Sequence, residues 1–149
     1  MSYAKPLPEP TPETQEFWDG LRRHELRIQR CQECRQHYFY PRPFCPRCHS
    51  TDVEWTTVSG RGTVETFVIN HRPSPGFADD APYVIAVVTL DEGPRLMTNL
   101  VDVAPAPQHV SADMPVEIVY DDVTAELTLP KFRPAAVEPK SGGKPADEE

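Results

Sequence analysis

All four cysteines of the chain lie in one short window, CQECRQHYFYPRPFCPRC, between Cys31 and Cys48. They form two C-x-x-C pairs with ten residues between the pairs. Two residues between cysteines allow a tight turn to direct both sulfur atoms at one ion, and two such turns complete a tetrahedral thiolate site. The spacing therefore predicts one metal site with four ligands: Cys31, Cys34, Cys45 and Cys48.

Zinc is the metal expected at this site; iron, as in rubredoxin-like sites, fits the same ligands and is less favoured. Four thiolates fill the coordination shell and leave no position for water or substrate, so we expect a structural metal. A redox role for one C-x-x-C pair would need a strand–helix–strand context, which the window lacks. His37 and His49 lie beside the ligands in sequence, and we expect both to stay outside the shell.

Length and charge narrow the class of protein. The chain has 149 residues, with 15 basic and 23 acidic side chains and a net charge of -8. This length suits one domain, or a small domain with an appendage, and the acidic charge disfavours a general nucleic-acid binder. The sequence has neither an apolar run of about 18 residues nor a secretory signal, so we expect a cytoplasmic protein with reduced thiols.

A helix is expected in the stretch TPETQEFWDGLRRHEL, where Thr11 can cap the first turn and Pro12 suits the first helical position. Phe17, Trp18 and Leu21 fall on one face of this helix. Two interpretations stay open. The face packs on the domain's own core, or it is an exposed docking element for a partner.

Strand-like segments dominate the rest of the chain. Short strands flank the two cysteine pairs, which is typical of a zinc ribbon, and about five strands with turn signals between them follow. One of these, YVIAVVTL, is a continuous apolar run, so we expect it to be buried on both faces. The expected fold class is mainly β, with an N-terminal helix, a rubredoxin-like zinc ribbon and a five-stranded OB-fold barrel. The expected ranges are 1–25 for an arm and docking helix, 26–57 for the ribbon, 58–135 for the barrel and 136–149 for a disordered acidic tail.

The segment around the ribbon is basic although the whole chain is acidic. Between residues 22 and 47 there are seven arginines, opposed only by Glu25 and Glu33. Aromatic side chains lie among them, and arginine forks suit phosphate groups. This surface is either a solvated basic face or a site for a phosphate-bearing ligand, which would be a nucleotide-containing cofactor such as coenzyme A (CoA) or a nucleic acid.

The order of these parts resembles a known family. FWDGL, the four-cysteine ribbon, GRGTVETFVI, PYVIAVVTLDEGPRLMTNL and LPKFRP are together similar to the acyl-CoA-associated zinc-ribbon/OB-fold family, domain of unknown function 35. The resemblance covers roughly residues 12–135. One departure is Asp113, which stands where the family commonly has a glycine before the methionine of the next strand.

The resemblance implies a non-catalytic accessory subunit with a structural zinc. Members of the family associate with thiolases, thiolase-like aldolases or hotdog-fold enoyl-CoA hydratases, in one case in steroid side-chain degradation, and hold the CoA part of an acyl-CoA. A heteromeric complex with such an enzyme is therefore expected. The residues chosen as CoA contacts by their side-chain chemistry are Arg42, Arg47, Lys131, Phe132 and Arg133.

Two other functions, a nucleic-acid-binding module and an independent enzyme, fit the sequence less well. A single-stranded nucleic-acid-binding module is possible for a ribbon joined to an OB barrel, but the acidic charge counts against it. An independent enzyme would need a catalytic set. The pairs Asp79–Asp80 and Asp121–Asp122 are poor candidates, because adjacent residues of a strand point to opposite faces.

Overall fold

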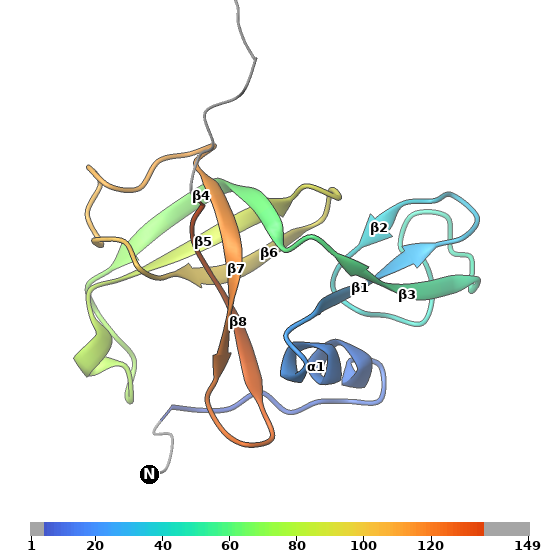
Figure 1. Cartoon of the computed structure of the whole chain (residues 1–149), viewed down its shortest axis with the longest axis horizontal. Helices are drawn as coiled ribbons and strands as arrows, with labels where there is room; N and C mark the ends of the chain where they lie inside the picture. The colour runs from blue at the N-terminus through green and yellow to red at the C-terminus, as the bar shows by residue number, and fades with distance from the viewer. Residues whose placement is uncertain (1–4, 136–149) are drawn as a thin grey trace, which may run out of the picture.

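The computed structural model describes residues 5–135 and confirms the expected fold class. The expected acidic tail lies outside these residues. A helix and a three-stranded ribbon stand beside a closed barrel (Figure 1). The first part contains α1 (Gln15–Arg22), β1 (Leu26–Cys31), β2 (His37–Tyr38) and β3 (Val53–Val58). The barrel contains β4 (Arg61–Asn70), β5 (Tyr83–Leu90), β6 (Arg95–Leu100), β7 (Pro115–Asp122) and β8 (Thr128–Pro134), with a 3₁₀ turn at Ala78–Asp80.

Helix α1 begins later than the sequence predicts. Thr14, not Thr11, occupies the N-cap position, and its side chain makes no capping hydrogen bond. A turn precedes the helix instead, closed by the Thr14 N–H, which donates to the Thr11 carbonyl at 2.9 Å. The Thr14 hydroxyl accepts from the Thr11 N–H, so it is turned away from the helix that it would otherwise cap.

The apolar face of α1 is part of the core, which settles the choice that the sequence left open. Leu21 is 0% exposed, and Phe17 and Trp18 are buried with it. The Phe17 ring lies 5.2 Å from the ring of Phe39, which joins the helix to the ribbon. The prediction that the Phe17–Trp18–Leu21 stripe is exposed is therefore wrong, because the stripe packs inside the chain and only small parts of Phe17 and Trp18 line a surface hollow.

The barrel closes in the strand order β4-β5-β6-β8-β7. Strand β5 alternates buried and half-buried residues along its length, so the expectation that it is buried on both faces is wrong. An antiparallel barrel strand has only one face toward the interior. The interior is filled by aliphatic side chains and by the ring of Phe132, which is 0% exposed, and half-buried Phe67 packs against them. Among residues 5–135, no helix has the length and apolar character that a membrane-spanning segment requires.

The departure at Asp113 has a backbone consequence. Asp113 has a φ of 66°, in the left-handed region, and its N–H donates to the Val64 carbonyl at 2.7 Å to hold the start of β7 beside β4. Glycine adopts this conformation without steric cost, whereas a residue with a Cβ does not.

We therefore expect Asp113→Gly to stabilise the protein, by about 0.5–1 kcal/mol after the added entropy of the unfolded chain is subtracted. Urea unfolding of the two proteins measures this difference. Asp113→Ala is the matched control and should destabilise, because alanine keeps the Cβ and lacks the tolerance of aspartate for this region. A glycine variant no more stable than the alanine variant would contradict the explanation.

Candidate metal centre and candidate ligand surface

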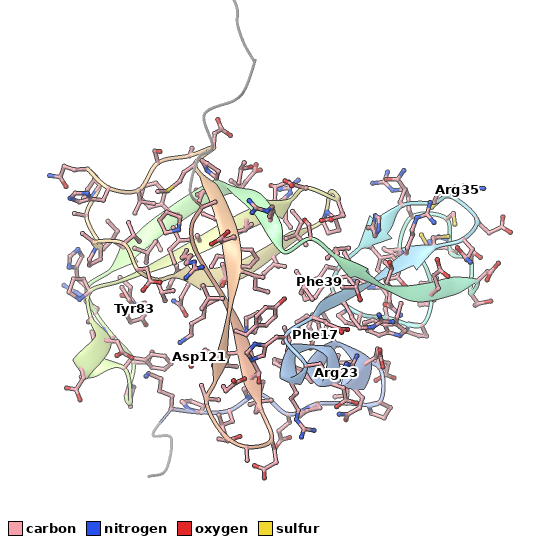
Figure 2. All side chains as sticks on the ribbon, in the orientation of Figure 1. Phe17, Arg23, Arg35, Phe39, Tyr83 and Asp121 are labelled. Atoms are coloured by element: carbon pink, nitrogen blue, oxygen red, sulfur yellow. The ribbon has the colours of Figure 1, made fainter. Side chains whose placement is uncertain are left out.

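The ribbon brings the four cysteines together at one end. Strand β1 pairs with β2 and β3, and it ends at Cys31, so the first turn starts where the sheet stops. The four sulfur atoms lie within 4.8 Å of one another. The Sγ of Cys31 is 3.5 Å from that of Cys48, and the Sγ of Cys34 is 3.7 Å from that of Cys45. Figure 2 shows sulfur atoms gathered in the ribbon near the labelled Arg35.

These distances fit a tetrahedral metal and exclude disulfides. Zinc–sulfur bonds of 2.3 Å in a tetrahedron place the sulfurs about 3.8 Å apart, whereas a disulfide needs about 2.05 Å. All four cysteines are free thiols. The sequence prediction that these residues share one metal site is therefore consistent with their geometry, and the donor set matches that of structural zinc sites.

Backbone N–H groups prepare two of the sulfurs for metal binding. The N–H of Cys48 and that of Arg47 donate to the Sγ of Cys45 at 3.5 Å and 3.3 Å, and together they lower the pKa of this thiol to about 6. The N–H of Cys34 likewise donates to Cys31 and lowers the pKa of its thiol. Thiolates are the form that binds metal, so the turn geometry favours ligation by Cys31 and Cys45.

The neighbouring histidines are not part of this cluster. Among residues 5–135, the group of side chains close enough to hold a metal consists of the four cysteines. His49 is exposed, its N–H donates to the Cys45 carbonyl at 2.9 Å, and its ring lies 6.2 Å from that of Phe44. His49 thus helps to shape the second turn without entering the shell.

The five residues chosen as CoA contacts do not form one site. Arg42 and Arg47 lie on the ribbon, whereas Lys131 and Arg133 lie on β8. Lys131 pairs with Asp121 at 2.7 Å, and Arg133 pairs with Glu117 at 2.9 Å. The prediction that Phe132 contacts CoA is wrong, because its ring fills the barrel interior and has no exposed surface.

Two adjoining hollows mark the surface beside Lys131. One, of about 470 Å³, lies next to the aromatic pair Phe77 and Tyr83, whose ring centroids are 5.9 Å apart. The other, of about 410 Å³, lies between α1, the Phe39–Tyr40 segment and β6. Lys131, Asn99 and Leu129 line both hollows, which therefore adjoin along the barrel; the hollow beside Phe77 and Tyr83 is hereafter called the depression.

A polar cluster that sequence reasoning missed joins the helix end to the barrel. The Nε2 of His24 lies 3.0 Å from an oxygen of Asp122, and the Thr128 hydroxyl donates to Asp122 at 2.5 Å. The His24 ring stacks on Tyr120, with centroids 4.8 Å apart. His24 and Asp122 are 98 positions apart, so no local sequence signal connects them.

The same cluster predicts a pH dependence. The Thr128 hydroxyl, together with His24, lowers the pKa of Asp122 below its usual value. A carboxyl with a lowered folded-state pKa stabilises the fold above its unfolded-state pKa, near 3.9, and loses this contribution as the pH falls through the folded-state value. We expect Asp122→Asn to be less stable than the natural protein at pH 5, with a difference that shrinks as the pH falls from about 3.9 through the lower folded-state pKa, as measured by urea unfolding at each pH. Equal stability at pH 5 would contradict this role.

The fold and the ribbon with its four clustered cysteines together define a zinc-ribbon/OB-fold protein. Comparison with known proteins gives the family to which it belongs. Residues 18–54 match the family model described as "ChsH2, rubredoxin-like zinc ribbon domain", and residues 55–121 match "ChsH2, C-terminal OB-fold domain". The chain is a member of this ChsH2 family, which is also named DUF35. The resemblance drawn from the sequence motifs is thus confirmed.

Relatives of two kinds match the chain. It is 40% identical over 84% of its length to the probable enoyl-CoA hydratase alpha subunit of Thermomonospora curvata, and 40% identical over 77% to the 3-oxo-4,17-pregnadiene-20-carboxyl-CoA hydratase alpha subunit of Mycobacterium tuberculosis. It spans only 39% and 36% of those two proteins. A DUF35 domain-containing scaffold protein of Pyrococcus furiosus is 38% identical over 66% of the chain and 76% of the relative.

A solved structure has the same architecture. A chain of the structure described as "Ltp2-ChsH2(DUF35) aldolase" superposes with a TM-score of 0.76 and 37% sequence identity. The match covers 87% of this chain and 100% of the other. The likeness therefore extends across helix, ribbon and barrel.

Proposed function

We propose that this protein is a non-catalytic accessory subunit that binds the CoA part of an acyl-CoA and docks on a larger enzyme. That enzyme is a thiolase-like protein, either a thiolase or a retro-aldolase, or a hotdog-fold enoyl-CoA hydratase. The pathway best supported is steroid side-chain degradation, because one relative is named for a steroid acyl-CoA. The metal that we propose for the four cysteines is structural zinc.

One observation carries this proposal. At 37% identity, the chain matches the whole length of one chain in a structure described as an Ltp2-ChsH2 aldolase, which supports a role beside a partner enzyme. The relatives named hydratase alpha subunits and scaffold proteins point the same way, since a subunit and a scaffold both act beside another protein.

The described residues favour a supporting role over catalysis. The four cysteines fill a tetrahedral shell, so a metal held there has no open position for substrate. In the His24 cluster, the Thr128 hydroxyl donates to the carboxylate of Asp122. Thr128 is only 2% exposed, so its hydroxyl is poorly placed to attack a substrate.

The depression along the barrel is the proposed place for CoA. The hollow of about 470 Å³ offers a basic group at Lys131 for phosphate and an aromatic pair, Phe77 and Tyr83, for stacking of adenine. Arg133 lies on the same strand as Lys131. Arg42 and Arg47 stay candidates on the ribbon and would contact CoA only if it extends that far.

Titration calorimetry of the isolated protein with CoA tests the ligand. Lys131→Met should weaken binding about tenfold, which corresponds to about 1.4 kcal/mol. Arg61→Met is the matched control, because Arg61 is also a basic strand residue near a carboxylate, Glu117, yet lies on β4 outside the depression. Equal affinity of the Lys131 variant and the natural protein would remove Lys131 from the site.

Co-elution with the enzyme tests the partner. The chain is mixed with a thiolase-like enzyme or enoyl-CoA hydratase from the same source, and the mixture is separated by size-exclusion chromatography with light scattering. A complex of defined mass is expected. Separate elution of the two proteins, with and without acyl-CoA, would overturn the accessory role.

A further inference from the structure

Strand β6 leaves part of one edge without a strand partner. On one side it pairs with β5 from Arg95 to Leu100. On the other side it meets β8 at a single register position, Leu100 with Phe132. Within residues 5–135, no strand pairs with the remaining part of this edge, Arg95 to Thr98.

Pro130 explains why the pairing stops. It lies on β8 two residues before Phe132, where the next hydrogen bond to β6 would be made, and proline has no N–H to donate. The Thr98 side chain spans the gap instead, since its hydroxyl donates to the Pro130 carbonyl at 3.2 Å. The two strands are therefore held together by a side chain where the backbone ladder is absent.

The backbone groups at the open edge can be assigned. The turn between β5 and β6 is closed by the Leu90 N–H, which donates to the Pro94 carbonyl at 2.8 Å. Hydrogen-bonded positions recur at every second residue of an antiparallel ladder. Leu96 and Thr98 therefore bond to β5, whereas Arg95 and Met97 direct their N–H and C=O groups to the open side.

An apolar groove adjoins this edge. The hollow of about 410 Å³ is lined by β6 residues on one side and by Phe17, Trp18 and Phe39 on the other. Trp18 is 8% exposed, and its Nε1–H has no hydrogen-bond partner among the described residues. The Nε1 itself is enclosed, so the part of Trp18 that lines the groove is apolar, as are the neighbouring rings of Phe17 and Phe39.

The outer face beside the edge is also apolar. Met97 is 72% exposed, and Val68, on β4, is 59% exposed. Between them, β5 presents half-buried Ile85 and Val87 on the same face. Exposed side chains of this size gathered on one sheet face are typical of an interaction surface.

We infer that an extended segment of the partner enzyme adds to the open edge of β6 as a further strand. Its backbone pairs with Arg95 and Met97, and its apolar side chains contact Met97 and the groove. The open edge spans four residues, about 13 Å, which suits a short strand. Arg95 is exposed and makes no ion pair within residues 5–135, so an acidic side chain of the segment fits beside it. This inference rests on the proposed function.

The net charge of the chain and the extent of the apolar surface favour a partner protein over a second copy of the chain or the pantetheine arm of CoA. A second copy of the chain would bring together two molecules that each carry a net charge of -8, which repel each other. The pantetheine arm of CoA could use the groove, but it would leave the Met97 side chain exposed and the backbone groups of Arg95 and Met97 without strand partners. A protein segment with its flanking surface covers both.

Amide hydrogen exchange, measured residue by residue by NMR on the free protein and on its complex with the partner enzyme, tests the backbone pairing. Exchange of the Met97 amide should slow about tenfold or more in the complex, whereas the Leu96 and Thr98 amides, already bonded to β5, should change little. Protection of the Met97 amide by CoA alone, or a dimer of the free chain that covers it, would overturn the inference.

Two lysine substitutions test the side-chain contacts. Met97→Lys should weaken partner binding about tenfold, and Val68→Lys, on the same face but two strands from the edge, less than about twofold. Both side chains are exposed, so both variants should fold, which thermal melts would verify. Equal effects of the two variants, or binding without protection of the Met97 amide, would overturn strand addition while leaving the accessory role intact. Failure of the natural protein to bind any partner would overturn both.

Discussion

Replacing Cys45 with serine is expected to abolish metal binding and to unfold the ribbon. Cys45 is buried, and its sulfur receives two backbone N–H donors, so serine at this position removes one of four ligands and leaves those donors poorly matched. Structural zinc contributes about 10–16 kcal/mol in small peptide domains, and a ribbon of three short strands has little apolar surface to replace that loss.

The loss of ordered structure in the Cys45→Ser variant should extend beyond the ribbon. Phe39 follows β2 and packs on Phe17 of α1, so disorder in the ribbon exposes part of the core between helix and barrel. Native mass spectrometry should find one metal per natural chain and none in the Cys45→Ser variant, and hydrogen exchange should rise in β1 to β3.

His49→Asn is the matched control for the metal centre. His49 directly follows the ligand Cys48 and has a φ of 67°, a conformation that asparagine tolerates. This variant should keep its metal and its stability. A Cys45→Ser protein that binds metal as the natural one does would contradict the four-sulfur site, and so would loss of the metal from His49→Asn.

Replacing Phe132 with alanine is expected to destabilise the protein by about 3–5 kcal/mol. Its ring has no exposed surface, and it lies where β8 meets both β6 and β7. Removing the ring leaves a cavity between these strands. For a domain whose total stability is about 5–15 kcal/mol, this loss is a large share.

Chemical unfolding of Phe132→Ala and of its neighbour variant Lys131→Met separates packing from surface chemistry. The alanine variant should show a much lower midpoint, while Lys131→Met should stay close to the natural protein. Any loss of CoA binding by Phe132→Ala would then follow from unfolding. A fully stable Phe132→Ala protein that fails to bind CoA would contradict the burial of this ring and return it to the ligand site.

Features that depend on local spacing could be predicted from the sequence. The two C-x-x-C turns specify their own geometry, and the strand segments between turn residues led to a five-stranded barrel, which is confirmed. The burial of β5 was predicted wrongly, because an apolar run has the same appearance whether one face or both are covered. The sequence shows that Ile85 and Val87 are apolar but not that they face outward.

Features that depend on distant contacts could not be predicted. Phe132 looked like a surface aromatic between two basic residues, Lys131 and Arg133, and alternation along β8 turns it inward. The pairing of His24 with Asp122 arises only when the end of α1 meets β7. The open edge of β6 likewise needs the strand order of the barrel, although Pro130 marks the place where pairing stops.

Steady-state turnover of an acyl-CoA by the partner enzyme, with and without this protein, tests the central claim most directly. The account predicts no turnover by this protein alone and a higher rate for the enzyme when the two are mixed, up to a fixed stoichiometry. Turnover by this protein alone, or an enzyme rate that stays the same at every ratio of the two proteins, would contradict it.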